Sequence, residues 1–309
     1  MATRCIGPIR GEHTMKIKIS GLFIKLAVLN HRLLKMTRNH TLAGWIWSSL
    51  RLVILTVFCI SSPPTECADI TSNSVPAEPF DYAQPKLLNG TVYETDSKHQ
   101  NVLFLFERSA VRSGSTVRVE RLFSLPDGST AAVEHIVYES GQLVSCEIKD
   151  LQAGLRGAIQ VGPDPKNPAR QEMVISHGNE TEARVKSNTQ EMPKDTLIGD
   201  MVYPFTLSHW DELMAGATVK FRFVSLERET TYGFKLSKAA EMVVNGKLAV
   251  VIRMEPASFV VARFMNPIYI TVEKDGTHRI LEYVGRTTPR FKKKNIWKYL
   301  EADTVFDWK

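Results

Sequence analysis

The stretch "VNGKLAVVIRMEP" at residues 244–256 places an Asn-Gly pair in front of alternating side chains. An Asn-Gly pair supplies the two positive φ angles of a tight turn, and alternation with a period of two is typical of a strand with one buried face. The apolar face of this strand would hold four residues: Leu248, Val250, Ile252 and Met254. The opposite face would hold Arg253 and Glu255. The stretch therefore predicts the second strand of a β-hairpin.

Similar turn signals recur along the chain, at Asn89-Gly90, Asp127-Gly128 and Asp275-Gly276. Because such pairs separate alternating segments, we expect one mainly β domain at residues 87–289, a long antiparallel meander of roughly ten strands. A strongly twisted sheet of this size tends to curl rather than to stay flat. The predicted architecture is thus a half-open barrel around one short central helix.

That helix is predicted within "FTLSHWDELMAGA" at residues 205–217, where the period changes. Its apolar stripe would consist of three residues: Leu207, Trp210 and Met214. Ser208 and Asp211 form a candidate capping pair, and Pro204 is expected to prevent the helix from starting earlier. We expect the stripe to pack on the sheet.

Residues 1–68 have the layout of a secretory signal peptide. A nine-residue apolar run, Leu52 to Ile60, follows Arg51 and precedes a polar stretch that ends in Cys67-Ala68. The run is too short for a membrane span, which needs ~20 residues. Met36 is the better start of such a signal, which leaves an upstream extension before it. An uncleaved anchor and an organelle transit sequence are the alternatives. We expect export to the periplasm or envelope, with residues 69–86 as a flexible lead-in.

Charge and cysteine content support removal of this leader. The first 68 residues hold nine of the 39 Lys and Arg residues but two of the 33 Asp and Glu residues, so the rest of the chain holds 30 and 31. A near-neutral domain gives no indication of nucleic-acid binding. Of the four cysteines, Cys146 alone lies beyond the leader. We expect it to be a packed thiol on the same strand face as Val144 and Ile148.

Catalytic signatures are sparse. The sequence has no G-x-S-x-G elbow, no Gly-rich phosphate loop after a strand and no Cys-rich or paired-His metal signature. His209, Asp211 and Glu212 are the best candidates for an acid-base or metal group, although a solvated helix face explains them more simply. We therefore predict no catalytic residues, no metal, no cofactor and no enzymatic activity.

The C-terminal segment 290–309 combines basic and aromatic residues and is predicted as a separate tail. Such a composition favours an anionic membrane, an envelope surface or another polyanion. The candidate contacts are Arg290, Lys292, Lys293, Lys294, Trp297 and Lys298. The alternative is a last helix that packs on the sheet through Ile296, Trp297 and Leu300 while its lysines stay in solvent.

Three stretches within residues 200–286 carry a resemblance to a known family: "DMVYPFTLSHWDELMAGATVKFRF", "VNGKLAVVIRMEP" and "ITVEKDGTHRILEYVGRT". They resemble the second half of the exported bacterial domain-of-unknown-function family 3108, in which a helix precedes a strand, a "G-K" hairpin and a closing hairpin with Asp at its tip. The resemblance implies a periplasmic or envelope setting and a shape akin to the half-barrels of lipoprotein carriers. It assigns no site residue.

The sequence is compatible with two functions. The first is an exported envelope protein that binds a hydrophobic or lipid ligand in a groove of the sheet, with Trp210, Phe221 and Phe223 as candidate ligand contacts. The alternative is a structural or interaction module that works through a sheet edge or the basic C-terminal segment. A hydrolase is the least favoured reading, because no nucleophile motif supports it.

Overall fold

The computed structural model describes residues 80–182, 185–293 and 295–308, with the side chain of Lys293 left out. These residues belong to one compact unit, Pro76–Lys309. The expected signal peptide at residues 1–68 and most of the expected lead-in lie outside the described residues. Among the residues described, no helix is both long enough and apolar enough to cross a membrane.

The first half of the described chain consists of eight strands. They are β1 (Leu87–Glu94), β2 (Val102–Ser113), β3 (Thr116–Ser124), β4 (Thr130–Glu139), β5 (Gln142–Asp150), β6 (Leu155–Asp164), β7 (Asn167–Asn179) and β8 (Lys186–Glu191). Each of these strands pairs antiparallel with the next, so the half is a simple meander.

The second half starts with a short strand and the helices and continues as another meander. Its elements are β9 (Thr196–Leu197), the 3-10 turn η1 (Gly199–Met201), α2 (Val202–Ser208), α3 (Trp210–Met214), β10 (Val219–Ser225), β11 (Thr230–Val244), β12 (Lys247–Pro256), α4 (Phe259–Ala262), β13 (Ile268–Glu273), β14 (Ile280–Lys293) and β15 (Ile296–Asp307).

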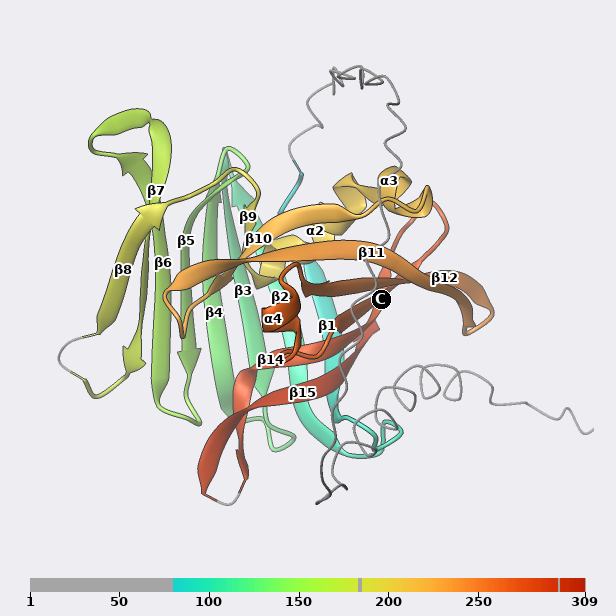
Figure 1. Cartoon of the computed structure of the whole chain (residues 1–309). Coiled ribbons are helices and arrows are strands. Elements are labelled where there is room, and N and C mark those ends of the chain that lie inside the picture. The colour runs from blue at the N-terminus through green and yellow to red at the C-terminus, as the bar shows by residue number, and fades with distance from the viewer. Residues whose placement is uncertain (1–79, 183–184, 294, 309) are drawn as a thin grey trace, which may run out of the picture. The chain divides into compact units, whose positions relative to one another are not determined.

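One sheet of fifteen strands unites both halves (Figure 1). Its order is β8-β7-β6-β5-β4-β3-β2-β1-β15-β14-β13-β12-β11-β10-β9, so the halves join where β1 pairs antiparallel with β15. The sheet does not close, because β8 and β9 form its two edges. The predicted fold class is confirmed: the protein is mainly β, an open antiparallel meander with a short central helix.

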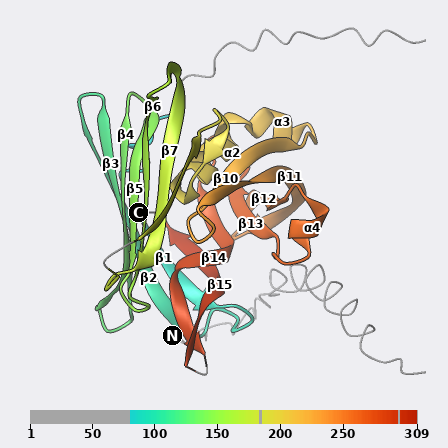
Figure 2. The same ribbon diagram turned by 60° about the vertical axis from the view of Figure 1, so that its left-hand side comes forward.

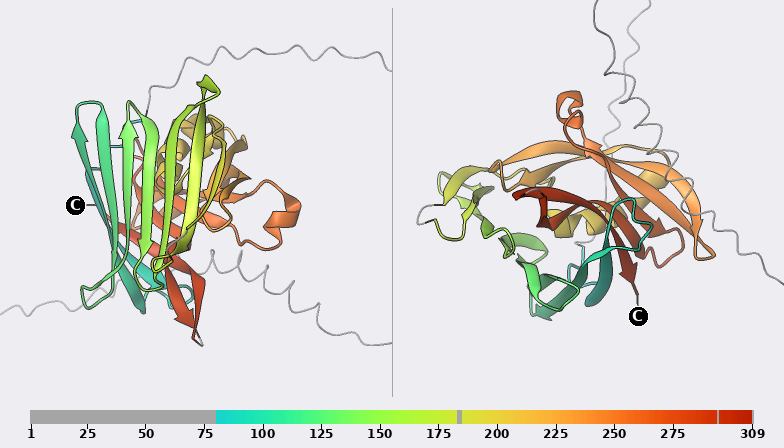
Figure 3. Two further views of the ribbon diagram at one scale, coloured as in Figure 1. Left: turned by 90° about the vertical axis from the view of Figure 1, so that its left-hand side faces the viewer. Right: turned by 90° about the horizontal axis from the view of Figure 1, so that it is seen from below.

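The sheet bends so strongly that its two halves face each other. In Figure 2, β3 to β7 form one wall and β10 to β13 the opposite wall. Seen from below, the strands curl around an interior instead of lying flat (Figure 3, right). This curl is the behaviour expected of a twisted sheet with many strands. Most buried apolar side chains form one large cluster between the walls.

The central helical segment holds the two walls together. Phe205 of α2 packs its ring 5.4 Å from the ring of Phe221 on β10, while the adjoining Asp200 of η1 is bonded to β2 and β4. The helix starts at Val202, earlier than predicted, because Pro204 lies in its first turn, where a missing N–H costs nothing. It also breaks at His209, so two short helices replace the single predicted one.

The predicted Ser208–Asp211 cap is wrong. The Ser208 hydroxyl instead donates a hydrogen bond of 2.9 Å to the Phe205 carbonyl oxygen, and α3 has no side-chain cap. The turn predicted at Asn89-Gly90 is also wrong, since both residues lie inside β1. Glycine is needed there for a close approach, because a Cβ on Gly90 would lie 3.1 Å from Phe306 Cδ1.

The C-terminal segment is part of the sheet and not a separate tail. Residues 290–293 complete β14 and residues 296–307 form β15, which pairs with both β14 and β1. The alternative of a final helix is wrong for the same reason. Backbone pairing on both sides of β15 outweighs any helical tendency, because each strand offers a full set of hydrogen-bond partners.

Cys146 is a buried free thiol, 2% exposed, and burial raises its pKa well above the usual value. This confirms the prediction of a packed thiol. Val144, however, does not share its face, because the register of β4 and β5 shifts at Val137/Tyr138 and leaves Val144 without an opposite residue. The bulge turns Val144 outward, where it is 36% exposed.

Candidate ligand-binding cavity

A cavity of about 890 Å3 lies between the two walls of the sheet and is partly open to solvent. This volume is within the range of ~300–1,000 Å3 that is typical of small-molecule sites. Most of its lining is apolar. The aromatic and aliphatic side chains from both walls include Phe106, Phe123, Ile159, Phe234, Met254 and Ile270. The bent sheet therefore encloses a hydrophobic interior that its own side chains do not fill.

The segment around α4 lies at a mouth of the cavity. Val261 and Met265 line the cavity and are half-buried, whereas Val260 and Phe264 line it and are 66% and 81% exposed. Phe259, the first residue of α4, is 78% exposed. Side chains that border both the interior and solvent mark an opening, and large apolar residues this exposed are uncommon on a surface without a partner.

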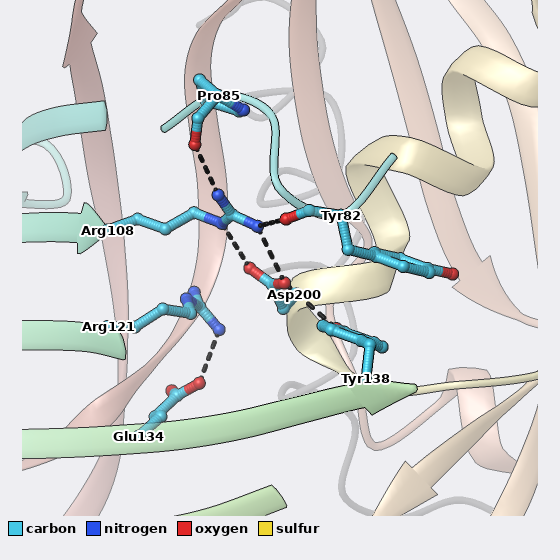
Figure 4. Close-up of polar contacts among 7 residues, drawn as sticks. All are labelled: Tyr82, Pro85, Arg108, Arg121, Glu134, Tyr138 and Asp200. Carbon is cyan, nitrogen blue, oxygen red and sulfur yellow. Dashed lines mark hydrogen bonds and ion pairs between the residues drawn. The ribbon is translucent and has the colours of Figure 1, made fainter. Parts of the chain in front are cut away.

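A buried ion pair, Arg108 and Asp200, lines the cavity, and Figure 4 shows its contacts. Arg108 of β2 donates from Nε to Oδ1 of Asp200 at 2.8 Å and from Nη2 to Oδ2 at 3.2 Å. The Tyr138 hydroxyl donates a third hydrogen bond, of 3.0 Å, to Oδ2. Arg108 also donates to the carbonyl oxygens of Tyr82 and Pro85, at 2.8 and 2.7 Å. Every oxygen of this buried carboxylate thus has a donor.

The charge of Asp200 is stabilised in place. Burial alone would raise the pKa of its carboxyl group, but the charge and hydrogen bonds of Arg108, the charge of Arg121 and the Tyr138 hydroxyl outweigh burial and lower the pKa. Burial and the nearby Asp200 charge have the opposite effect on Tyr138 and raise the pKa of its phenol. The Asp200 carboxyl group therefore stays ionised, and its contacts suit a structural clamp between η1 and β2.

A second ion pair joins two neighbouring strands of the first half and links them to β14. Arg121 of β3 donates from Nη1 to Oε2 of Glu134 on β4 at 2.7 Å (Figure 4). The other carboxylate oxygen of Glu134 accepts a hydrogen bond from the Thr288 hydroxyl on β14. All three side chains line the cavity. Each ion pair consists of one positive and one negative charge, so these four side chains add no net charge to the cavity lining.

An arginine pair lies at the solvent-facing rim of the cavity. The guanidinium carbons of Arg286 and Arg290 lie 4.9 and 4.7 Å from the ring centroid of Tyr299. The Tyr299 hydroxyl donates a hydrogen bond of 2.7 Å to Oε2 of Glu227, which follows β10. Burial, followed by the hydrogen bond to Glu227, raises the pKa of Tyr299 to about 12, so its phenol stays protonated. All four residues line the cavity.

The three predicted ligand contacts have different places in the structure. Phe223 lines the cavity. Phe221 is 2% exposed and packs in the core, 6.0 Å from the ring of Phe234, and Trp210 packs 4.5 Å from the ring of His278. Neither Phe221 nor Trp210 borders the cavity. Both residues are core side chains, Phe221 on β10 and Trp210 on α3, and do not reach a ligand there.

The candidate acid-base group does not reach the cavity. Asp211 and Glu212 are exposed on α3. The His209 ring nitrogen Nδ1 lies 3.0 Å from the Phe205 carbonyl oxygen and 3.0 Å from the Ser208 hydroxyl. None of the three lines the described cavity. Within the described ranges, no cluster of three or more His, Cys, Asp or Glu side chains is arranged to hold a metal ion.

The basic residues predicted to contact membranes fall on the hairpin of β14 and β15. Arg290 lines the cavity at its rim, with 16% of its side chain exposed. Lys292 and Lys298 are exposed, and the Lys292 ammonium lies 5.6 Å from the Trp297 ring centroid. The side chain of Lys293 and the whole of Lys294 lie outside the described residues.

Arg108, Arg121, Glu134 and Asp200 were missed by sequence reasoning. Charged residues in strands are usually assigned to the solvent face, although Arg108 stands at the same phase of β2 as Phe104 and Phe106. This position is the one signal that the sequence offers, because an arginine on the apolar face of a strand needs a buried partner of opposite charge.

Comparison with known proteins gives no relative: no family model, no curated protein and no solved structure matches the chain. The resemblance to the exported bacterial family therefore stays a prediction, and the function has to be argued from the cavity.

Proposed function

We propose that the protein binds a hydrophobic or lipid ligand in the cavity between the two walls of its sheet. The single observation that carries this proposal is the volume of about 890 Å3 with a mostly apolar lining. A well-packed domain leaves few voids larger than a water molecule, because every void forfeits dispersion contacts. A cavity this large suits an apolar occupant of considerable size.

The rest of the fold supports this use. The two ion pairs that line the cavity, Arg108–Asp200 and Arg121–Glu134, present no unbalanced charge to a ligand, and the exposed side chains around α4 give apolar access from one side. The candidate acid-base residues His209, Asp211 and Glu212 do not border the cavity and so give no support to catalysis there. Binding is therefore better supported than catalysis.

We further propose that the protein acts outside the cytoplasm, in the periplasm or the envelope. This part rests on the composition of residues 1–68 and on the near-neutral charge of the remainder. Amino-terminal sequencing of the chain recovered from a bacterial periplasmic extract would test it. A start close to Asp69 agrees with export, whereas an intact leader on a cytoplasmic protein contradicts it.

A dye titration tests the binding proposal. An uncharged phenylnaphthylamine dye, which fluoresces in apolar surroundings, is added to the detergent-free protein. We expect saturable enhancement that is competed by long-chain amphiphiles. The absence of enhancement, both before and after organic extraction of the protein, would show that the interior does not admit apolar molecules.

A second candidate function, an interaction module, has one observation in its favour. β8 forms an edge of the sheet, pairs only with β7 and is almost wholly exposed, so its outer backbone groups are free for another strand. The exposed Lys292 and Lys298 offer a second surface. Because β15 lies inside the sheet, deletion of residues 290–309 would damage the fold, and the charge reversals Lys292→Glu and Lys298→Glu are the better test of envelope association.

A further inference from the structure

The arginine pair at the rim, Arg286 and Arg290, is not accounted for by the fold alone. Both guanidinium groups lie within 5 Å of the centroid of one ring, that of Tyr299. The two guanidinium carbons are therefore no more than about 10 Å apart, and in partly apolar surroundings solvent screens the repulsion between their charges only in part. Such an arrangement costs free energy unless an anion compensates it.

Nearby carboxylates compensate it only in part. Glu227 Oε1 lies 3.8 Å from Arg290 Nη2, beyond hydrogen-bond distance, and its other oxygen accepts the Tyr299 hydroxyl. Asp150 Oδ2 accepts the backbone N–H of Arg290 at 2.9 Å rather than its guanidinium. Among the residues that the structure describes, no carboxylate lies within 4 Å of the Arg286 guanidinium.

Glu301 would be the natural partner of Arg286, because the two residues are directly opposite each other on β14 and β15. Its carboxylate instead accepts hydrogen bonds of 2.8 and 2.6 Å from the side-chain amide of Asn266, which follows α4. The Glu301 carboxylate therefore binds Asn266 and forms no ion pair with Arg286.

The hydrogen-bond donors of the pair are also largely unused. A guanidinium has five N–H donors in a planar fork that matches a carboxylate or a phosphate. In the described part of the chain, one bond uses them, from Arg290 Nη2 to the Tyr299 hydroxyl oxygen at 3.4 Å. Arg290 is nevertheless well buried, with 16% of its side chain exposed. These donors border the cavity and solvent, where a ligand group could accept from them.

We propose that the ligand is an amphiphile whose anionic head, a carboxylate or a phosphate, binds Arg286 and Arg290 while its apolar tail lies in the cavity. Leu226 and Ile148 line the cavity close to Glu227 and Asp150, so the apolar wall begins directly beside the arginine pair. This inference rests on the proposed function and adds the chemical class of the ligand.

The test compares two probes of equal tail length, dodecanoate and dodecanol, by displacement of the uncharged dye from the full chain at neutral pH. We expect the wild-type protein to bind dodecanoate about tenfold to a hundredfold more tightly, as charge-assisted hydrogen bonds imply. Arg286→Gln and Arg290→Gln should each reduce this preference while dodecanol binding is unchanged. Arg118→Gln, which removes an exposed charge outside the cavity, is the matched control and should keep the preference.

The outcomes separate this inference from the proposed function. Equal affinity for both probes, or a preference that survives both substitutions, overturns the anionic-head assignment while the cavity remains a hydrophobic site. Failure of both probes to displace the dye overturns the assignment and counts against the proposed function as well.

A third arm distinguishes an amphiphile from a small free anion. Acetate and inorganic phosphate carry the head chemistry without a tail. We expect each to protect the protein against thermal unfolding far less than dodecanoate does at the same concentration. Equal protection by phosphate alone would assign the arginine pair to a free anion and overturn the amphiphile.

Discussion

Arg108 and Asp200 lie 92 positions apart in the chain, yet their side chains form a bidentate, buried ion pair. The pair joins β2 to η1, the turn that begins the central helical segment. Because the carboxylate also accepts the Tyr138 hydroxyl, three elements meet at one charged group. Because α2 follows η1 and packs Phe205 on Phe221 of β10, the pair helps to link strands of the first half to the opposite wall.

Asp200→Asn tests this clamp. The substitution leaves the buried guanidinium of Arg108 without a counter-charge, which typically costs about 3–5 kcal/mol. We expect a loss of this size in the free energy of unfolding measured by urea denaturation. The control is Glu191→Gln, whose ion pair with Arg170 is about 60% exposed on both sides and should contribute at most ~1 kcal/mol. Similar losses for the two variants would contradict a special role of the clamp.

Gly285→Ala probes the packing of β14. A Cβ at this position would lie 2.9 and 3.0 Å from two carbons of Ile268 and 3.1 Å from the Tyr283 ring. Overpacking of this kind costs about 1–3 kcal/mol. Gly162→Ala, in the strand β6 with no atom within 4 Å of the added carbon, should be neutral or slightly stabilising. Thermal unfolding of both variants measures the difference. Equal melting temperatures would contradict the tight packing of Gly285 against Ile268 and Tyr283.

His99 should make stability depend on pH. Its Nε2 lies 3.5 Å from Glu282 Oε1 and 4.0 Å from Asp303 Oδ2. The hydrogen bond to Glu282 outweighs burial and raises the pKa of His99 above the usual 6.5. A raised pKa means that the stabilising contribution is complete below pH 6.5 and is lost as the pH rises through the folded-state pKa.

We therefore expect His99→Asn to destabilise the protein more at about pH 5.5 than at about pH 8.5, on either side of the usual titration range of histidine. Asparagine suits the site, because His99 has a φ of 59°. Urea denaturation of both proteins at both pH values measures the effect. An equal destabilisation at the two pH values would contradict the ion pairing.

Ile148→Trp should reduce the volume available to a ligand. Ile148 lines the cavity on β5 directly opposite Gly157, and because the Leu226 side chain already packs over Gly157, a larger ring at position 148 has to extend into the cavity. We expect dye binding to fall several-fold while the protein stays folded by circular dichroism. Val144→Trp adds the same ring to the outer face of the same strand and should leave dye binding unchanged. Unchanged binding in Ile148→Trp would place the dye elsewhere.

The sequence predicted the class of fold because its turn signals and alternation are local. Asn245 and Gly246, with φ values of 51° and 81°, form the turn expected between β11 and β12. The number of strands was underestimated, since several hairpins turn through single glycines such as Gly114 and Gly154, which no Asn or Asp precedes. Asn89-Gly90 has the sequence of a tight turn but lies inside β1, where the glycine allows Phe306 to approach closely.

The candidate site was harder to predict, because its parts come from distant strands. Phe223 was expected from strand alternation and does line the cavity. Arg286 and Arg290 meet on Tyr299 only after β14 pairs with β15 through a register shift. A shift of register changes which side chains share a face, and local patterns carry no information about it. The arginine pair therefore had no signature in the sequence beyond basic composition.

Native mass spectrometry of the protein, produced with its own leader in a bacterial host and purified without detergent, tests the central claim most directly. The account predicts a reproducible mass above that of the polypeptide, which disappears after organic extraction and is diminished in Ile148→Trp. A mass equal to the polypeptide alone, together with no uptake of added amphiphiles, would contradict a ligand-binding cavity.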